Sequence, residues 1–191
     1  MVIGINEIIN ESGSGERPYI PLVFGLCNNF NNFKCIELGT GAGSFLSSIA
    51  LACKEKGKVY TIDKDGCQSA REKISRFGLS DYVEFLVMDD VSEDAITYFK
   101  NFGQVFSLIM IDTSHEHLHT LKELEIYSEF LIKGGYIVLH DSNPQAPYDV
   151  RRAIETFLKN DYNPNSNKSD FVWGLDLNGH PPGLTILRRI E

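Results

Sequence analysis

The hydrophobic residues of this chain fall into short apolar runs separated by stretches with helical periodicity. The apolar runs predict strands at residues 33–38, 58–63, 83–87, 106–112 and 136–141. Between and after them, apolar side chains recur at helical spacing, which predicts helices over 44–56, 67–77, 92–101, 116–132 and 150–158. The run at 106–112 is apolar throughout, as expected for a central parallel strand buried on both faces.

Regular alternation of strands and helices is typical of a parallel sheet, because each helix returns the chain to the start of the next strand. The alternation stops after Leu158, where the polar residues 160–170 predict a loop. Two short strands are expected near 171–175 and 183–188, with no helix between them. We therefore predict an α/β fold with a doubly wound, mainly parallel seven-stranded sheet, helices on both faces and an antiparallel last strand.

The length of 191 residues predicts a single domain over residues 1–191. Residues 33–191 carry the alternating pattern and form its expected core. The first 32 residues lie outside this pattern, with a loop predicted at 11–18 and a short helix at 19–27. We expect this N-terminal segment to act as a lid or to contact the substrate.

Composition and charge narrow the possible partners. No apolar run reaches the roughly 18 residues of a membrane span, and the N-terminus lacks the features of a signal peptide, so we expect a cytoplasmic protein without a membrane partner. The net charge is −8 and the basic residues are scattered, which argues against a nucleic-acid partner. Cys35 and Cys53 lie among apolar residues and are expected to be small core residues rather than metal ligands.

The sequence E-L-G-T-G-A-G at residues 37–43 follows the first predicted strand. Glycines there permit positive φ and let a ligand approach the backbone closely. Glu37 would repel a pyrophosphate but suits a ligand with an ammonium group, and Asp63 ends the next strand, where a carboxylate can bind ribose hydroxyls. Ser44 stands where a dinucleotide-binding turn has glycine or alanine. A ligand with a ribose, an amino group and no phosphate describes S-adenosylmethionine.

Further motifs follow this turn in order: Y-T-I-D at 60–63, M-D-D at 88–90, L-I-M-I-D-T-S-H at 108–115 and K-G-G-Y-I-V-L-H-D at 133–141. The series resembles the class I methyltransferases, and within them the small-molecule O-methyltransferases that include catechol-type enzymes and bacterial sugar and antibiotic methyltransferases. The resemblance implies cofactor-binding roles for a set of residues, namely Glu37, Gly39, Thr40, Gly41, Gly43, Asp63, Asp89 and Asp112. Among these, Asp63 would bind the ribose and Asp89 would lie beside the adenine amino group.

Two carboxylates follow the fourth and fifth predicted strands. Asp112 and Asp141 are suited to hold Mg²⁺ or another divalent cation, which would lower the pKa of an acceptor hydroxyl. Catechol-type enzymes add an asparagine directly after the second acid, whereas this chain has Ser142 there and Asn143 one residue later. The third ligand is therefore open. In the alternative without a metal, Asp112 orients the cofactor and Asp141 caps a loop.

Histidine is the natural general base near neutral pH. The resemblance places the catalytic lysine of catechol-type enzymes at the position of His115, which we expect to act as base or to orient the substrate. His117 and His119 are expected on a solvated helix surface, and a zinc pair of His115 and His119 is the weaker alternative. His140 faces the site or lies hydrogen-bonded in the core, and His180 is expected in a plain loop.

The sequence thus predicts methyl transfer from S-adenosylmethionine to a hydroxyl of a small-molecule acceptor. The alternatives are a cofactor-binding protein without turnover, and a different reaction on the same scaffold, as in proteins associated with cephalosporin hydroxylation. The sequence does not identify the methyl acceptor. A homodimer is one possible assembly, and no sequence feature favours it or argues against it. Two interpretations stand for a set of aromatic residues, which either line the acceptor pocket or pack in the core: Tyr19, Phe24, Tyr148, Phe171 and Trp173.

Overall fold

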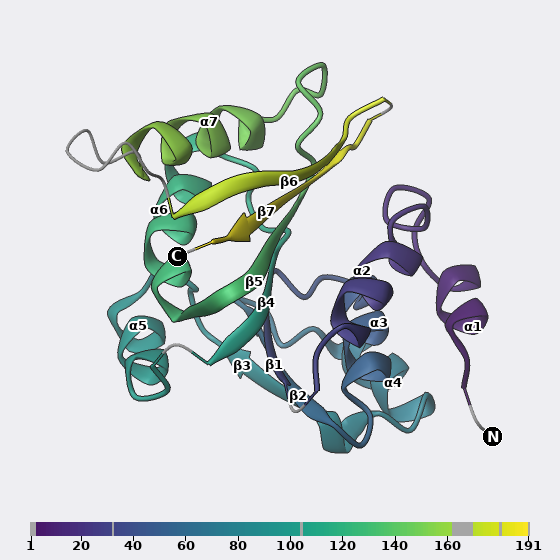
Figure 1. Cartoon of the computed structure of the whole chain (residues 1–191). Coiled ribbons are helices and arrows are strands. Elements are labelled where there is room, and N and C mark those ends of the chain that lie inside the picture. The colour runs from purple at the N-terminus through teal and green to yellow at the C-terminus, as the bar shows by residue number, and fades with distance from the viewer. Residues whose placement is uncertain (1–2, 32, 104, 162–169, 180, 191) are drawn as a thin grey trace. The chain divides into compact units, whose positions relative to one another are not determined.

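The computed structural model describes residues 3–31, 33–103, 105–161, 170–179 and 181–190 (Figure 1). These residues form two compact units, which we call unit 1 (Met1–Asp90) and unit 2 (Val91–Glu191). No helix among the described residues is both long enough and apolar enough to span a lipid bilayer. His180 and most of the polar loop expected at 160–170 lie outside the described residues.

Unit 1 is a three-stranded parallel sheet with helices packed against it (Figure 1). The strands lie in the order β3-β2-β1, and Phe33 of β1 pairs with Gly57 of β2. The helix α3 contacts α1, α2 and α4. The elements are α1 (Ile5–Asn10), α2 (Ile20–Asn28), β1 (Phe33–Leu38), α3 (Ser44–Cys53), β2 (Gly57–Asp63), α4 (Gln68–Arg76), the 3₁₀ turn η1 (Ser80–Tyr82) and β3 (Val83–Val87).

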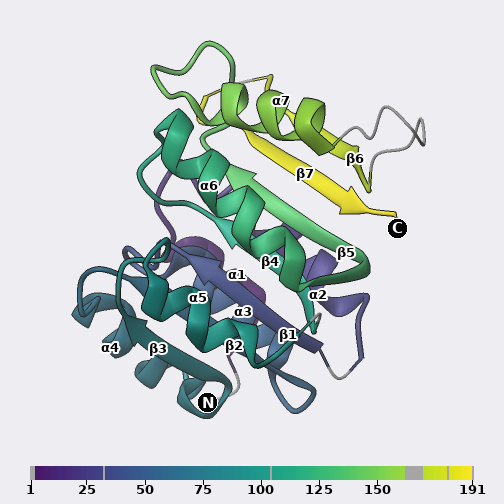
Figure 2. The same ribbon diagram turned by 90° about the vertical axis from the view of Figure 1, so that its left-hand side faces the viewer.

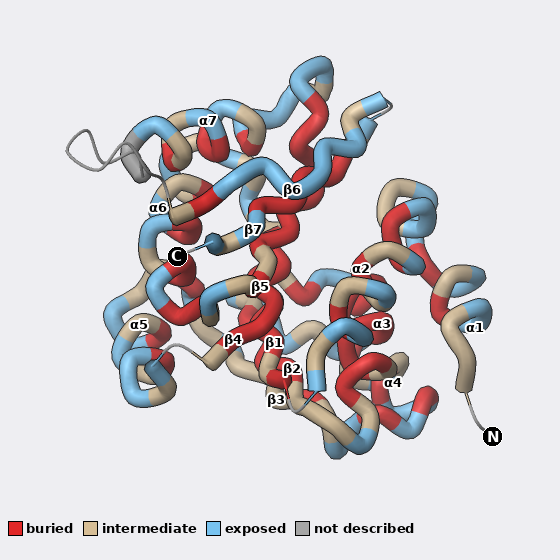
Figure 3. Tube along the Cα trace, viewed as in Figure 1, coloured by how far each residue is buried: buried red, intermediate tan, exposed pale blue. Residues whose placement is uncertain are grey.

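The core of unit 1 explains why these segments take up their positions. All but one residue of β1 is buried, as Figure 3 shows for this strand. The side chains of Cys27, Cys35 and Cys53 are fully buried among apolar residues, which confirms the expectation that Cys35 and Cys53 belong to the core. Burying such small apolar groups removes about 25 cal/mol per Å² of unfavourable contact with water.

Unit 2 contains four strands in the order β4-β5-β7-β6. β4 and β5 are parallel, whereas β7 is antiparallel to both β5 and β6. Figure 2 shows α6 and α7 side by side across these strands. The elements are α5 (Glu93–Lys100), β4 (Phe106–Ile111), α6 (His117–Tyr127), the 3₁₀ turn η2 (Ser128–Phe130), β5 (Leu131–His140), α7 (Val150–Asp161), β6 (Phe171–Leu177) and β7 (Leu184–Arg189).

The described residues therefore form seven strands, and both antiparallel pairings in unit 2 involve β7. This confirms the predicted α/β class, the mainly parallel arrangement and the antiparallel last strand. The apolar run of β4 is buried at every position, as expected for a central strand. Whether residues 1–191 form one domain stays a prediction.

The junction between α6 and β5 differs from the expectation. The predicted helix over 116–132 ends at Tyr127, and β5 begins at Leu131 rather than after the two glycines. Gly134 has a φ of 81° inside the strand. Between the pairs Phe106–Leu131 and Leu108–Tyr136, residues 132–135 of β5 lie against the single Ser107 of β4. The glycines permit this bulge within the strand, so they do not mark its start.

A second difference is the helix α1, which the sequence pattern did not predict. It spans less than two turns, and only Ile8 is buried along it. Its first turn is stabilised by Glu7, whose Oε2 accepts a hydrogen bond of 3.0 Å from the backbone N–H of Gly4. A helix this short has too few apolar positions to show a period of 3.6 residues.

Candidate functional site

The glycine turn at residues 39–43 joins β1 to α3 in unit 1. Gly39, Gly41 and Gly43 have φ values of 86°, 47° and 76°, in the left-handed region that favours glycine. A Cβ on Gly43 would lie 2.9 Å from the Cβ of Ala70 in α4, whereas a Cβ on Gly41 would meet no heavy atom within 4 Å. Gly43 is therefore also required by helix packing, and Gly41 leaves open space beside the backbone.

The carboxylate of Asp63 holds this turn from the end of β2. Its Oδ2 accepts hydrogen bonds from the backbone N–H groups of Thr40 at 3.0 Å and Gly41 at 3.2 Å. Its Oδ1 accepts a third from Asp65 N–H at 3.0 Å. Burial by itself would raise the pKa of Asp63, but these donors and the Cys67 thiol hold that pKa below its ordinary value. Asp63 is thus charged and already shapes the turn.

Glu37 lies 1% exposed beneath the turn, in register with Thr61 of the neighbouring strand. The Thr61 hydroxyl donates to Glu37 Oε2 at 2.6 Å, and the Thr40 hydroxyl lies 2.6 Å from the Thr61 hydroxyl. Since the Thr61 proton points to Glu37, the Thr40 hydroxyl is the donor of the second bond. Thr40 therefore directs its side chain inward, which leaves its backbone as the part that can face a cofactor.

The acidic pair after β3 separates into an exposed and a buried residue. Asp89 is exposed, whereas Asp90 is 5% exposed. The preceding Met88 donates its backbone N–H to the carbonyl oxygen of Asp63 at 3.0 Å, which ties this segment to the end of β2. Within unit 1, this hydrogen bond holds Met88, the residue before Asp89, at the end of β2 beside Asp63. The role of Asp89 beside the adenine stays a prediction.

In unit 2, four side chains at or just after the ends of β4 and β5 form what we call the acid–histidine cluster: Asp112, His115, His140 and Asp141. His115 Nε2 lies 3.2 Å from Asp112 Oδ1 and 3.1 Å from Asp141 Oδ2. His140 Nδ1 lies 3.3 Å from Asp112 Oδ1 and 2.9 Å from Asp141 Oδ2. The structure therefore brings together the predicted residues Asp112, His115 and Asp141, and His140 joins them from a buried position.

The backbone that presents this cluster is strained. His115 and Asp141 have φ values of 59° and 55°, which non-glycine residues seldom adopt. Such conformations cost about 1 to 3 kcal/mol and persist where the surrounding structure enforces them, often at functional sites. They turn two side chains from different segments toward Asp112.

Each histidine is shifted toward its charged form by the carboxylates. The hydrogen bond with Asp112 raises the pKa of His115, against the opposing effect of burial. Burial would lower the pKa of His140, but the hydrogen bonds with Asp112 and Asp141 raise it to about 10. Burial would raise the pKa of Asp112, and the two histidines instead lower it. Without a bound cation, the pKa shifts of both histidines therefore favour the imidazolium form over the neutral form.

Three members of the cluster could hold a metal ion. One ligand atom from each of Asp112, His115 and Asp141 lies within 4.8 Å of the others. Asn143 is engaged elsewhere, because its Nδ2 donates to Asn178 O at 2.8 Å and its Oδ1 accepts from Gln145 N–H at 2.7 Å. The geometry favours His115 over Asn143 as a third ligand.

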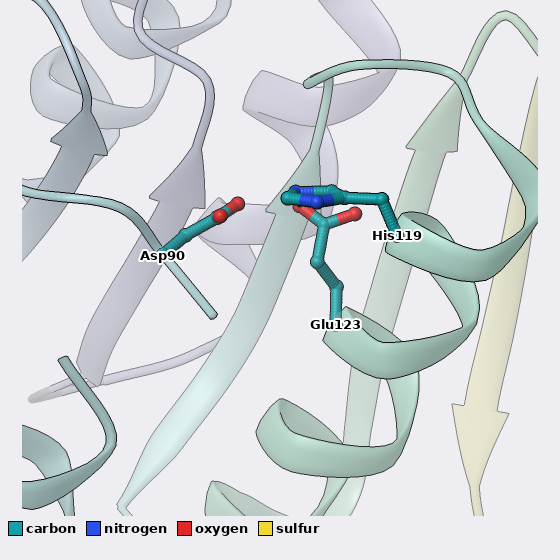
Figure 4. A group of neighbouring side chains, drawn as sticks. All are labelled: Asp90, His119 and Glu123. Carbon is teal, nitrogen blue, oxygen red and sulfur yellow. The ribbon is translucent and has the colours of Figure 1, made fainter. Parts of the chain in front are cut away.

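The remaining histidines of α6 are half-buried, contrary to the expected solvated surface. His117 Nε2 lies 3.1 Å from the hydroxyl of Thr156 in α7. His119 points toward Glu123 one turn along α6, as Figure 4 shows, with 3.7 Å between Nε2 and Oε1. Because α6 packs against α7 and β4, this part of its surface is covered.

Sequence reasoning missed two groups that support the candidate site. Thr61 stands directly across from Glu37 in the parallel register, so placing the two strands side by side would have revealed it. Cys67 has a φ of 47° at the start of α4, and its thiol is hydrogen-bonded to Asp63. Nothing in the sequence pattern indicates a left-handed cysteine at that position.

A family model described as a methyltransferase domain matches residues 36–142, more than half of the chain. The match begins in β1 and ends just after β5, and so includes the glycine turn and the acid–histidine cluster.

Rhamnosyl O-methyltransferases of Mycobacterium tuberculosis and Mycobacterium bovis are 26% identical to the chain over 160 residues. The match covers 75% of the chain and 64% of the mycobacterial proteins, so the chain spans less than two thirds of their length.

Two solved structures share the fold at low sequence identity. The O-methyltransferase of tomaymycin synthesis from Streptomyces achromogenes, in complex with S-adenosylmethionine, is 16% identical with a TM-score of 0.70. The match covers 97% of the chain and 90% of that protein. A Bacillus cereus O-methyltransferase in complex with S-adenosylhomocysteine is 15% identical with a TM-score of 0.72, over 98% of the chain and 90% of that protein. These likenesses confirm the predicted fold.

Proposed function

Because the chain belongs to the methyltransferase domain family, we propose that it transfers a methyl group from S-adenosylmethionine to a hydroxyl group of a small molecule. The observation that carries this proposal is the glycine turn with its two acids, Glu37 and Asp63, inside the matched region. The names of the mycobacterial relatives and of both solved structures include O-methyl transfer, which supports oxygen as the acceptor atom.

The residues of the turn fit the cofactor. The backbone beside Gly41 is open, and the carboxylate of Asp63 has about one acceptor position beyond its three backbone donors, which the Cys67 thiol uses here and a ribose hydroxyl would take over. The buried carboxyl group of Glu37 would suit the ammonium of the methionine end, and it offers no donor to a phosphate in its ionised form. Asp63 would then both shape the turn and bind the ribose.

Calorimetric titration with S-adenosylhomocysteine tests this part of the proposal. We expect Asp63→Ala to weaken binding by about 10- to 100-fold, because it removes charged hydrogen bonds and the support of the turn. The matched control is Asp65→Ala, an exposed acid two residues away whose backbone alone contacts Asp63. Equal affinities for the two variants would remove Asp63 from the cofactor site.

We further propose that Asp112, His115 and Asp141 hold a divalent cation that assists the reaction. In methyl transfer the acceptor oxygen attacks the methyl carbon, the bond from that carbon to sulfur breaks, and the hydroxyl proton must leave. A bound cation would lower the pKa of that hydroxyl. His115 would then be a ligand rather than the general base. A site with one imidazole nitrogen and two carboxylates suits Mn²⁺ or Zn²⁺ as well as Mg²⁺.

Titration of the chelator-treated protein with Mn²⁺, Zn²⁺ and Mg²⁺ tests the cation separately from turnover. We expect one cation to bind to the wild-type protein, and His115→Ala to weaken its binding by about tenfold or more. His117→Ala is the matched control, since His117 lies on the same segment but bonds to Thr156. Full activity in the presence of chelator, or unchanged cation affinity in His115→Ala, would contradict the metal-assisted form of the proposal.

A further inference from the structure

The loop that joins β5 to α7, residues 141–149, carries an exposed aromatic ring beside the acid–histidine cluster. The ring centroid of Tyr148 lies 4.8 Å from that of His115, and the two ring planes meet at 54°. Tyr148 is 43% exposed, whereas Ser142 and Asn143 at the start of the same loop are buried. An aromatic surface is therefore accessible at the edge of the cluster.

Hydrogen bonds at both ends fix the loop that presents this ring. The backbone N–H of Asp149, next to Tyr148, donates to the carbonyl oxygen of His115 at 3.0 Å. At the other end, Asn143 donates its side-chain amide to the carbonyl oxygen of Asn178. The position of Tyr148 is thus coupled to the backbone of His115. The Tyr148 ring is therefore exposed on a loop that hydrogen bonds hold in place.

The contact with His115 accounts for only part of the Tyr148 ring. Aromatic ring pairs with centroids about 4.5 to 7 Å apart attract each other, which explains why the Tyr148 ring lies against the ring of His115. The exposed part gains nothing from folding, because apolar surface stabilises a protein only when it leaves water. Exposed side chains on loops held by a rigid scaffold commonly contact ligands.

We propose that Tyr148 is a specificity-determining residue, whose exposed ring packs against a ring of the acceptor while a hydroxyl on that acceptor ring reaches Asp112 and Asp141. The inference rests on the proposed function and adds to it the chemical class of the acceptor, a hydroxylated six-membered ring. Two kinds of molecule share this chemistry. A catechol offers an aromatic face, and a sugar offers the C–H face of its pyranose ring, so the test includes one probe of each kind.

The test measures binding of catechol and of methyl rhamnoside to the protein with S-adenosylhomocysteine present, by ligand-observed NMR. We expect at least one probe to bind to the wild-type protein and Tyr148→Ala to weaken that binding by about tenfold, the scale of losing one aromatic contact. Tyr148→Phe should retain the wild-type affinity, because the ring rather than the hydroxyl makes the contact. The matched control is Trp173→Ala, which removes a similarly exposed aromatic ring, from β6.

Affinity for S-adenosylhomocysteine, measured on the same samples, separates this inference from the proposed function. We expect Tyr148→Ala to bind it as the wild-type protein does, which also shows that the variant is folded. Equal probe affinities for Tyr148→Ala and Trp173→Ala, or an equal loss in Tyr148→Phe and Tyr148→Ala, would overturn the role of the ring. If neither probe bound to a wild-type protein that binds S-adenosylhomocysteine, the ring-shaped acceptor would be wrong and the cofactor site would stand. Absence of cofactor binding would instead contradict the proposed function.

Discussion

At the scale of single residues, the candidate site depends on carboxylates that already make hydrogen bonds within the protein when no ligand is bound. Asp63 accepts three backbone hydrogen bonds, and Glu37 accepts the hydroxyl of Thr61. Asp112 and Asp141 each contact both histidines of the cluster. Substituting one of these acids therefore changes both the stability of the fold and the affinity for a ligand. Each variant thus needs a measurement of unfolding and a measurement of binding.

The pH dependence of stability isolates the structural part of Asp63. Because its pKa is lowered in the folded protein, the charged form stabilises the fold above the ordinary pKa of 3.8, and this contribution is lost as pH falls through the lower folded value. We expect the free energy of unfolding, measured in urea, to fall less between about pH 7 and pH 3 in Asp63→Asn than in the wild-type protein. Parallel pH profiles of the two proteins would show that the hydrogen bonds of Asp63 do not depend on its charge.

At the scale of elements, the glycine turn is fixed by the packing of two helices. Gly43 precedes α3 and lies against Ala70 of α4, whereas Gly41 faces open space. Both glycines have left-handed backbone angles, so alanine is strained at either position. Only at position 43 does a methyl group also collide with a neighbouring helix.

We therefore expect Gly43→Ala to lower the free energy of unfolding by about 1 to 3 kcal/mol beyond the effect of Gly41→Ala, which adds backbone strain alone. Urea unfolding of the two variants measures this difference directly. Gly41→Ala, if folded, should instead weaken the binding of S-adenosylhomocysteine, since its methyl group occupies the open space. Equal stability of the two variants would contradict the packing role of Gly43.

Most strands could be predicted because their apolar runs end at clear turn signals, and β1 and β3 have the predicted bounds. The start of β5 could not, because Gly134 and Gly135 are typical of a turn but here permit a bulge inside a strand. For the site, motif positions placed Asp112, His115 and Asp141 at neighbouring strand ends. Their mutual contacts, and the inclusion of His140, depend on left-handed angles at His115 and Asp141 that no sequence pattern indicates.

At the scale of the whole molecule, the fold is settled while the reaction is proposed. Solved methyltransferases share the fold over nearly the entire chain, yet at 15 to 16% identity they show nothing of the acceptor. The family match covers both the glycine turn and the acid–histidine cluster. The function of the protein therefore depends on these two groups of residues, and the binding of S-adenosylhomocysteine and of a divalent cation tests them separately.

An assay of methyl transfer tests the proposed reaction itself. The wild-type protein would be incubated with S-adenosylmethionine carrying a deuterated methyl group, a panel of hydroxylated sugars and phenols, and each of the three divalent cations. Mass spectrometry would then follow both products. We expect a deuterated methyl group on an oxygen of one acceptor, together with an equal amount of S-adenosylhomocysteine, and loss of both products in Asp63→Ala. A folded protein that binds S-adenosylmethionine but methylates no acceptor under any of these conditions would contradict the account.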